Sequence, residues 1–375
     1  MDFGFSQEQE QLRATVRDYL QRELPCSFAR AMLEDERGFT DKAWKDLADL
    51  GWLGLTVPES YGGSGLGLLD LVLVLEAAGA VALPGPFVST VSLGLPAVLA
   101  TASEDQLGAL VPEIATGVRR VTCAIAERAG RWNAAAISAT ARRDGAGFVL
   151  EGRKLFVPDA VGADTVVVVA RLDDGLGFFA LPATLPGLTI EAMQTVDRTR
   201  RLAVVTLQGV RVEEWCLLGR RAVGSGVLDG IVDVAKVALA AEMTGAAERA
   251  LEMTVEYTGV REQFGRAIAT FQAIQHRCAD MKVEVENCKS LAYYAAWAID
   301  SNDPGRALAA AMAKAYASDA CPRVIADAVQ LHGGIGFTWE HDLHIYFKRV
   351  KADEPTYGDG IANREQVARA LDLVR

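Results

Sequence analysis

The pattern of apolar residues changes its period twice along this chain, and these two changes constrain the fold most. Up to about residue 119 the apolar side chains recur every three or four residues, as on amphipathic helices. The next hundred or so residues contain short β-branched or aromatic runs separated by turn signals, at 148–150, 165–170, 178–181 and 203–207. Helical patterning then returns in long segments rich in Ala, Glu, Met and Lys. We therefore predict a mostly α, α+β protein with an N-terminal helical domain, a central antiparallel β-barrel or sandwich and a C-terminal helical domain, over 1–119, 120–222 and 223–375.

Several helix boundaries can be placed from capping residues. Ser6 is a candidate N-cap with Gln9 three positions later, which is the spacing of a capping box. Thr40 opens a second helix, and Gly51 is placed to end it. An apolar helix is expected over 66–80.

The composition excludes several classes of protein. The net charge is −11, whereas a nucleic-acid surface needs a basic face. No run of about 18 apolar residues occurs, so we predict no membrane span. The first dozen residues lack the basic and apolar regions of a signal peptide. The six cysteines form no CxxC pair, which indicates free thiols in a reducing compartment. We expect a soluble, cytoplasmic enzyme or binding protein.

Two common kinds of site are not supported by the sequence. The Gly-rich stretch 63–67 does not match GxGxxG and follows a turn instead of a strand, which argues against a nicotinamide dinucleotide site. His341 and His344 have a spacing that zinc ligands on a helix can have. No cysteine or carboxylate cluster completes such a site, so we predict no metal.

The first candidate block for chemistry reads YTGVREQFG at 257–265, followed by Phe271 and Gln272. An Arg at the end of a helix, here Arg261, can fork onto a pyrophosphate. Phe and Gln side chains can then hold the adenosine part of a dinucleotide. A charged helix end with a packing Phe remains the alternative on these residues alone.

The second block reads QLHGGIGF at 330–337. Paired glycines after an apolar helix, Gly333 and Gly334, let a backbone come close to a ligand. An ordinary helix C-cap has the same pattern, so this alternative also stays open.

Taken together at this separation, the two blocks resemble the acyl-CoA dehydrogenase family. The resemblance extends over nearly the whole chain, through the segments SQEQEQLRATVRDYL, Trp52 to Gly63, RxxFG…FQ…ADM and QLHGGIGFTWEHDLHIYFKR. It implies a helical N-terminal domain, a central β-domain and a C-terminal four-helix bundle, assembled as dimers or tetramers.

The resemblance also implies a cofactor, FAD, and a substrate, an acyl-CoA thioester. In such proteins a carboxylate removes the α-proton while the β-hydrogen leaves as hydride to the flavin, and electrons pass to an electron-transfer flavoprotein. Residues of one subunit contact the FAD of its neighbour, and the matching positions here are Arg261, Phe264, Gln272, Gln330, Gly333 and Gly334.

The sequence departs from the family at the base, which is usually a Glu in one of two places. Gly358 and Ala235 occupy the matching positions here. Asp359, one residue from the first position, is our candidate base. Asp233 lies roughly 200° around the helix from Ala235, and Glu242 lies on nearly the same face but about 10 Å along. A solvated or salt-bridged carboxylate is the alternative for each.

The strands expected to face the flavin also differ from the family. Phe156 keeps an aromatic side chain and is a predicted cofactor contact, but Ala126 and Pro158 replace two hydroxyl-bearing residues. Losing two hydrogen bonds to the flavin costs on the order of 1–3 kcal/mol. This pattern resembles the non-catalytic partner in heteromeric acyl-CoA dehydrogenases of actinobacterial sterol side-chain breakdown.

Three hypotheses follow for the function. The chain is an active FAD-dependent acyl-CoA dehydrogenase with an unusual base, working as a homodimer or homotetramer. Alternatively, it is a weak or silent subunit that completes the FAD site of an active paralogue in a heterotetramer. The third hypothesis is an acyl-CoA-binding scaffold without flavin.

Overall fold

The computed structural model describes residues 4–373. The chain forms two compact units, each built from several stretches of sequence. Unit 1 takes the residues up to 31, 68–83 and those from 236 onward, and unit 2 takes 32–67 and 84–235. The N-terminal helices therefore divide between the two units. Within the described residues, no helix has both the length and the apolar character needed to cross a membrane.

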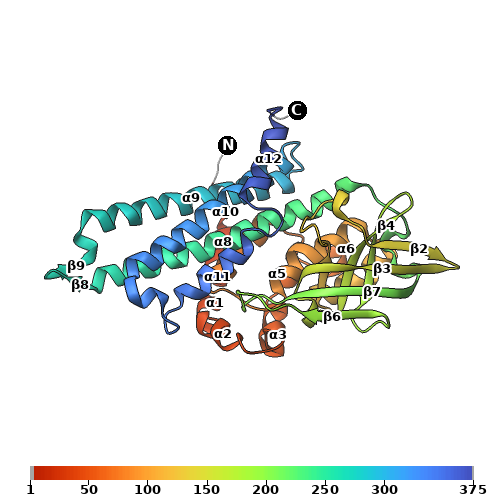
Figure 1. The fold of residues 1–375 in the computed structure, drawn as a ribbon, viewed down its shortest axis with the longest axis horizontal. Coiled ribbons are helices and arrows are strands. Elements are labelled where there is room, and N and C mark those ends of the chain that lie inside the picture. The colour runs from red at the N-terminus through yellow and green to blue at the C-terminus, as the bar shows by residue number, and fades with distance from the viewer. Residues whose placement is uncertain (1–3, 374–375) are drawn as a thin grey trace. The chain divides into compact units, whose positions relative to one another are not determined.

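Unit 1 is helical, and Figure 1 shows its long helices α8, α9 and α10 lying along one another. α8 begins in unit 2 and runs mostly through unit 1. The capping box predicted at Ser6 and Gln9 is present at the start of α1. The helices of this unit are α1 (Gln7–Glu23), α2 (Cys26–Ala31), α4 (Leu68–Ala80), α8 (Ser225–Val260), α9 (Gln272–Asp300), α10 (Arg306–His332), α11 (Leu343–Asp353) and α12 (Gly360–Ala370).

Two glycines allow α4 and α8 to approach each other closely in unit 1. A Cβ atom on Gly79 would lie 1.9 Å from the carbonyl oxygen of Glu242, and one on Gly245 would lie 1.8 Å from that of Glu76. Any larger residue at either position would force the two helices apart. The backbones therefore meet here.

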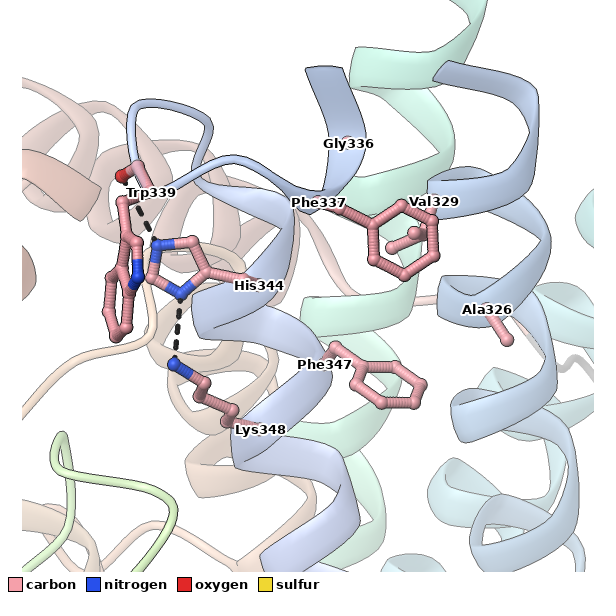
Figure 2. A pocket seen from close by; sticks show the side chains of 8 residues that line it. All are labelled: Ala326, Val329, Gly336, Phe337, Trp339, His344, Phe347 and Lys348. Atoms are coloured by element: carbon pink, nitrogen blue, oxygen red, sulfur yellow. Dashed lines mark hydrogen bonds between the residues drawn. The ribbon is translucent and has the colours of Figure 1, made fainter. Parts of the chain in front are cut away.

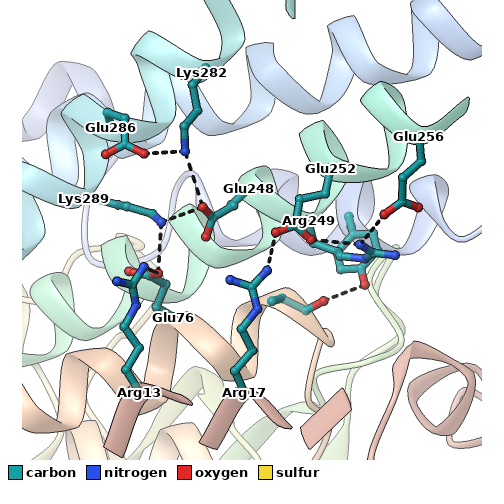
Figure 3. Close-up of polar contacts among 12 residues, drawn as sticks. Arg13, Arg17, Glu76, Glu248, Arg249, Glu252, Glu256, Lys282, Glu286 and Lys289 are labelled. Atoms are coloured by element: carbon teal, nitrogen blue, oxygen red, sulfur yellow. Dashed lines mark hydrogen bonds and ion pairs between the residues drawn. The ribbon is translucent and has the colours of Figure 1, made fainter. Parts of the chain in front are cut away.

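Buried and partly buried charges in unit 1 form a network between α1, α4, α8 and α9 (Figure 3). The Nζ atom of Lys289 lies 2.6 Å from a carboxylate oxygen of Glu248 and 3.3 Å from one of Glu76. Arg13 lies 3.6 Å from the Glu76 carboxylate. Each of these charges has a partner of opposite sign, as burial requires.

Unit 2 combines short helices with a single sheet. Thr40 caps α3 by accepting a hydrogen bond from the Ala43 amide, and Gly51 has a φ of +76° just after the helix, so both predicted boundaries are confirmed. The helices are α3 (Asp41–Asp49), α5 (Phe87–Ser89), α6 (Leu95–Thr101) and α7 (Glu104–Ala115), with a π-helical turn at Thr90–Gly94 joining α5 to α6.

The sheet has seven strands and lies within the segment predicted for it. All four predicted runs are strands, whereas β1, β2 and β6 were not predicted individually. The strands are β1 (Val121–Ala124), β2 (Thr140–Asp144), β3 (Gly147–Pro158), β4 (Thr165–Leu172), β5 (Gly175–Pro182), β6 (Leu188–Ala192) and β7 (Leu202–Glu213).

The pairing of the strands is mixed, which differs from the antiparallel sheet that we expected. β4 pairs parallel to β1, with Val121 opposite Thr165, and meets β2 in parallel at one position. The other ladders, β2–β3, β3–β7, β4–β5 and β6–β7, are antiparallel. The chain between β1 and β4 is long enough for the crossover that a parallel pair needs. The sheet core is apolar and includes Leu150, Val166, Val168, Phe179, Leu181 and Val205.

Candidate functional site

The first block forms a hairpin at the end of α8. Arg261 follows the helix directly, and its carbonyl accepts a hydrogen bond from the Ile268 amide at 2.8 Å. Strands β8 (Glu262–Gln263) and β9 (Arg266–Ala267) pair around a turn in which Phe264 and Gly265 have φ values of +54° and +78°. Phe264 is 93% exposed, and a Cβ on Gly265 would meet no atom within 4 Å. The Phe264 ring and the Arg261 guanidinium of this hairpin are therefore both exposed and available to a ligand or a partner subunit.

A second aromatic ring and guanidinium lie at the base of this hairpin. The Arg266 guanidinium sits 4.1 Å above the ring of Phe271, and Phe264 meets Phe271 edge to face at 6.2 Å. Phe271 precedes α9, and the exposed Gln272 is its first residue. Cation–π and aromatic contacts of this kind suit a planar, negatively charged ligand. Arg266 was not among the predicted residues, although its place between Phe264 and Phe271 in the sequence was a usable signal.

The second block ends α10 and presents its glycines to open space. Gln330 is exposed on the last turn of the helix. Gly333 has φ +64° and ψ −139°, a conformation open essentially only to glycine. Cβ atoms on Gly333 and Gly334 would meet nothing within 4 Å. A ligand can therefore approach this backbone closely.

A stack of rings joins the two blocks at one end of the helical bundle. The Tyr257 ring, one turn before Arg261, stacks on the His332 imidazole with centroids 4.5 Å apart. The His341 ring packs edge-on against the His332 ring, with the two ring centroids 4.7 Å apart. Burial lowers the pKa of His332 below its ordinary 6.5, and burial together with His332 does the same to the pKa of His341. The six residues that were predicted to contact a neighbour's FAD therefore lie at the same end of unit 1.

A pocket of about 380 Å³ lies beside the second block (Figure 2). Lys348 holds its Nζ atom 4.0 Å from the Trp339 ring centre, and the His344 Nε2 atom lies 3.3 Å from the Trp339 carbonyl oxygen. The lining is largely apolar and aromatic: Ala326, Val329, Gly336, Phe337, Trp339, His344, Phe347 and Lys348. Sequence reasoning did not predict this pocket, because it depends on how α10 and α11 pack.

Asp359, the candidate base, lies at the start of α12. Its exposed carboxylate accepts a hydrogen bond from the Ala362 amide at 2.7 Å and so caps the helix. Gly358 has a φ of +94°, and a Cβ there would lie 3.0 Å from the Asn363 Nδ2 atom. Any side chain at the usual Glu position would therefore be strained in this backbone.

The other two carboxylates have different surroundings. Glu242 is fully buried, and its carboxylate lies 3.1 Å from the Arg349 guanidinium, which is equally buried. It therefore serves as the counter-ion of Arg349. Ala235 is buried in α8, and Asp233 is partly buried two residues before it.

The candidate base Asp359 and the residues that were predicted to contact a neighbour's FAD lie far apart on one chain. The carbonyl oxygen of Gly358 is hydrogen-bonded to Lys314 of α10 at 3.0 Å. Gly333, just beyond the end of that helix, is about 28 Å further along. The structure therefore does not bring Asp359 together with the two blocks.

In unit 2, Phe156 has the features of a ligand contact. It lies at an irregularity of β3 between Lys154 and Val157, with a φ of +54°, and 40% of its surface is exposed. A strained backbone and an exposed aromatic ring are common at binding sites. The Pro158 carbonyl accepts a hydrogen bond from Thr122, and the buried Ala126 offers no hydroxyl.

A buried ion pair fixes the backbone next to Phe156. Lys154 Nζ lies 2.7 Å from the Glu127 carboxylate, which also accepts hydrogen bonds from the Ala139 amide and from Ser138. Burial opposes the charge on Glu127, but Lys154 and Ser138 outweigh it and hold the pKa of Glu127 below its ordinary value. The strand β3, which carries Phe156, is therefore tied through Lys154 to Glu127 in the segment that follows β1.

These features fit the two parts of FAD unequally. The bundle end offers a guanidinium, aromatic rings and open glycine backbone, which suit an adenosine diphosphate. The β-unit offers an aromatic ring at Phe156 but no hydroxyl at the positions of Ala126 and Pro158. Among residues 4–373, no group of three or more His, Cys, Asp or Glu side chains is arranged to hold a metal ion.

Comparison with known proteins gives the family. The family models for the N-terminal, middle and C-terminal domains of acyl-CoA dehydrogenases match residues 6–118, 122–212 and 224–371. Acyl-CoA dehydrogenase IpdE2 of Mycolicibacterium smegmatis is 31% identical over 97% of this chain and 98% of its own.

Two solved structures extend the comparison. A chain of the ChsE4–ChsE5 complex from Mycobacterium tuberculosis is 29% identical, with a TM-score of 0.91 and full coverage of both chains. A chain from a structure described as the electron transferring flavoprotein of Acidaminococcus fermentans is 30% identical, with a TM-score of 0.91 and 99% coverage of both chains. The chain belongs to the acyl-CoA dehydrogenase family, the FAD-dependent oxidoreductases that act on the CH–CH bonds of acyl-CoA thioesters.

Proposed function

We propose that this chain is a subunit of an oligomeric acyl-CoA dehydrogenase that completes the FAD site of a neighbouring subunit. The observation that carries this proposal is the exposed hairpin, with the Phe264 ring 93% exposed beside the exposed Arg261. An aromatic ring that is held in a tight turn, is 93% exposed and contacts only the edge-to-face neighbour Phe271 among the aromatic rings of the hairpin suits a contact that forms on assembly. The residues that would hold the neighbour's FAD are Arg261, Phe264, Gln272, Gln330, Gly333 and Gly334.

The distance along α10 supports assignment of these residues to a second flavin. Asp359 and the glycines of the second block are separated by about 28 Å of helix. One chain would thus serve its own centre at one end and its neighbour's at the other. Binding of FAD and assembly would then stabilise each other.

We propose that the chain's own proton abstraction is weak and depends on Asp359. Bound FAD supplies the hydride acceptor, while the chain must supply the base that takes the α-proton. Oδ1 of the Asp359 carboxylate already accepts a hydrogen bond from the Ala362 amide as the helix cap, so Oδ2 is the oxygen that would take the α-proton. Losing a well-placed base costs about 10²–10⁴-fold in rate.

The proposed assembly contains a paralogue and passes electrons to a second flavoprotein. The partner is an active subunit of the same fold, in a heterotetramer, and a similar chain is described as part of the ChsE4–ChsE5 complex. An electron-transfer flavoprotein is the proposed acceptor, and a similar chain comes from a structure of an electron transferring flavoprotein. The six cysteines are free thiols, which supports the cytoplasm as the compartment.

The test measures flavin content and assembly together. The wild-type chain is purified alone and with candidate paralogues, and the visible spectrum gives the flavin-to-chain ratio of each. Arg261→Ala removes a charge-assisted contact and should weaken FAD binding by about 10–100-fold in the assembly. Arg306→Ala removes an equally exposed guanidinium from the far end of α10 and should leave FAD binding unchanged.

Two results would count against the proposal. A wild-type chain that is monomeric with one FAD per chain would show that no neighbour is needed. Equal FAD affinity in Arg261→Ala and Arg306→Ala assemblies would remove the hairpin from the site.

A further inference from the structure

The turn that leads into Asp359 has an unfavourable backbone. Tyr357 and Gly358 are consecutive residues with φ values of +59° and +94°. Glycine adopts such a φ readily, but for Tyr357 this conformation is rare and persists only where surrounding contacts fix it. The contacts that fix this turn therefore determine where Asp359 lies.

Lys314 of α10 supplies some of those contacts. Its side chain is completely buried. The ammonium donates to the carbonyl oxygens of Glu354 at 2.9 Å and Gly358 at 3.0 Å, and to the Ser318 hydroxyl at 2.7 Å. All three ammonium hydrogens are thus used, and two of them hold the two ends of the turn.

A second hydrogen-bond donor, on α12, also contacts the Gly358 carbonyl. The Asn363 Nδ2 atom of α12 donates to the Gly358 oxygen at 2.8 Å and to the Asp359 oxygen at 3.0 Å. Asn363 is itself fully buried. The peptide that precedes Asp359 is therefore held between α10 and α12.

We propose that Lys314 is a positioning residue for Asp359: by tying both ends of the 354–358 turn to α10, it fixes the backbone from which the carboxylate projects. This inference rests on the proposed role of Asp359 in proton abstraction. Lys314 itself acts only through the turn.

A buried ammonium is a poor choice for stability alone. Burial lowers the pKa of Lys314 to about 8. The nearby carboxylates of Asp353, Asp359 and Glu354 raise this pKa in part, whereas the Lys236 ammonium lowers it slightly further. In the unfolded chain the pKa of this lysine is 10.5, so the ammonium holds its proton more tightly there than in the folded protein. Burial of the charge therefore lowers the free energy of unfolding by its full amount below about pH 8. This loss of stability decreases as the pH rises from about 8 towards 10.5. A methionine would fill the space without this penalty. What the methionine lacks is the three hydrogen bonds that define the turn.

The charge state makes a direct test possible. A neutral amine donates two hydrogen bonds instead of three. The turn should therefore loosen when the pH rises through the region of 8, even in the wild-type protein. The charged groups that face the ammonium are the carboxylates of Asp353 (α11), Glu354 and Asp359 and the ammonium of Lys236 (α8).

The experiment compares amide hydrogen exchange of peptides covering 354–364 by pulse labelling at pH 7 and pH 9, corrected for intrinsic rates. The full-length wild type, Lys314→Met and the surface control Lys45→Met are measured. We expect exchange in Lys314→Met to be at least about tenfold faster than in wild type at pH 7 and insensitive to pH. Lys45→Met should match wild type within about twofold. If Lys314→Met does not fold, the wild-type difference between pH 7 and pH 9 and the Ser318→Ala variant, which lacks one acceptor, decide the question.

A second measurement separates positioning from packing. Anaerobic flavin bleaching by acyl-CoAs should slow about tenfold in Lys314→Met, while the acyl-CoA concentration at half-saturation stays unchanged. If the flavin of the wild-type protein does not bleach at all, the proposed role of Asp359 is wrong. The exchange data then still test whether Lys314 fixes the 354–358 turn. Unchanged protection of 354–364 in Lys314→Met, or wild-type protection equal at pH 7 and pH 9, would overturn the inference.

Discussion

Gly358→Glu would restore a carboxylate at the family's usual base position, and the structure indicates how much stability this change removes. A side chain at φ +94° costs about 1–3 kcal/mol in backbone strain. Its Cβ would lie 3.0 Å from the Asn363 Nδ2 atom, so Asn363 must shift and weaken its bonds to the turn. Weakening one such hydrogen bond adds about 0.5–1.5 kcal/mol. We expect a total loss of about 1.5–4.5 kcal/mol in the free energy of unfolding.

The matched control is Gly358→Ala, which carries the strain and the Cβ contact without the carboxylate. Urea unfolding followed by circular dichroism should give similar losses for both variants. Anaerobic flavin bleaching in the presence of straight-chain and steroid acyl-CoAs then isolates the carboxylate. We expect Gly358→Glu to bleach about 10²-fold faster than Gly358→Ala.

One outcome would refute the estimate of backbone strain, and another would refute the role of the missing carboxylate. If Gly358→Ala is as stable as wild type to within about 0.5 kcal/mol, the strain argument is wrong. If Gly358→Glu bleaches no faster than Gly358→Ala, a missing base is not what limits the chain's own turnover.

Two further predictions concern buried charge and pH. Glu242→Ala leaves the buried Arg349 guanidinium without its carboxylate partner and should cost about 3–5 kcal/mol, measured by urea unfolding, whereas a loss below about 1 kcal/mol would mean that the pair is not buried in solution. Burial lowers the pKa of His332 and His341 below 6.5, so their contribution to stability is fully present above pH 6.5 and is lost as the pH falls through the lowered values. The melting temperature should therefore drop between pH 7 and pH 5, and by less in His332→Phe, which keeps a ring against Tyr257.

Much of the fold could be predicted because its signals are local. The N-caps at Ser6 and Thr40 and the glycine after α3 depend on residues within one turn of each other. The parallel pairing of β1 with β4 depends on residues more than forty positions apart, Val121 and Thr165, and no local pattern specifies it. The division of the N-terminal helices between two units is equally non-local.

The arrangement of the candidate residues could be predicted where they are neighbours in the sequence, and not where it depends on packing. Arg261, Phe264 and Gln272 are close in sequence and share one hairpin and helix start. Helical geometry placed Glu242 near the face of Ala235, but it could not reveal Arg349 as its partner. The role of Lys314 likewise requires the turn 354–358 to fold back onto α10.

A subunit built this way can lose its own base and still serve a neighbour, which can be tested with a double variant. The Gly358 turn is held by Lys314 and Asn363, whereas the Arg261 hairpin is joined to the bundle end through Tyr257 and His332. The two regions lie about 28 Å apart along α10, and changes beyond about 7–10 Å usually add within roughly 0.3–0.5 kcal/mol. Arg261→Ala should therefore weaken FAD binding by the same factor in the wild-type and Gly358→Glu backgrounds, measured by FAD titration of the assembled protein. A coupling above about 1 kcal/mol would mean that the two ends of the bundle communicate, and the independence of the two centres would then have to be abandoned.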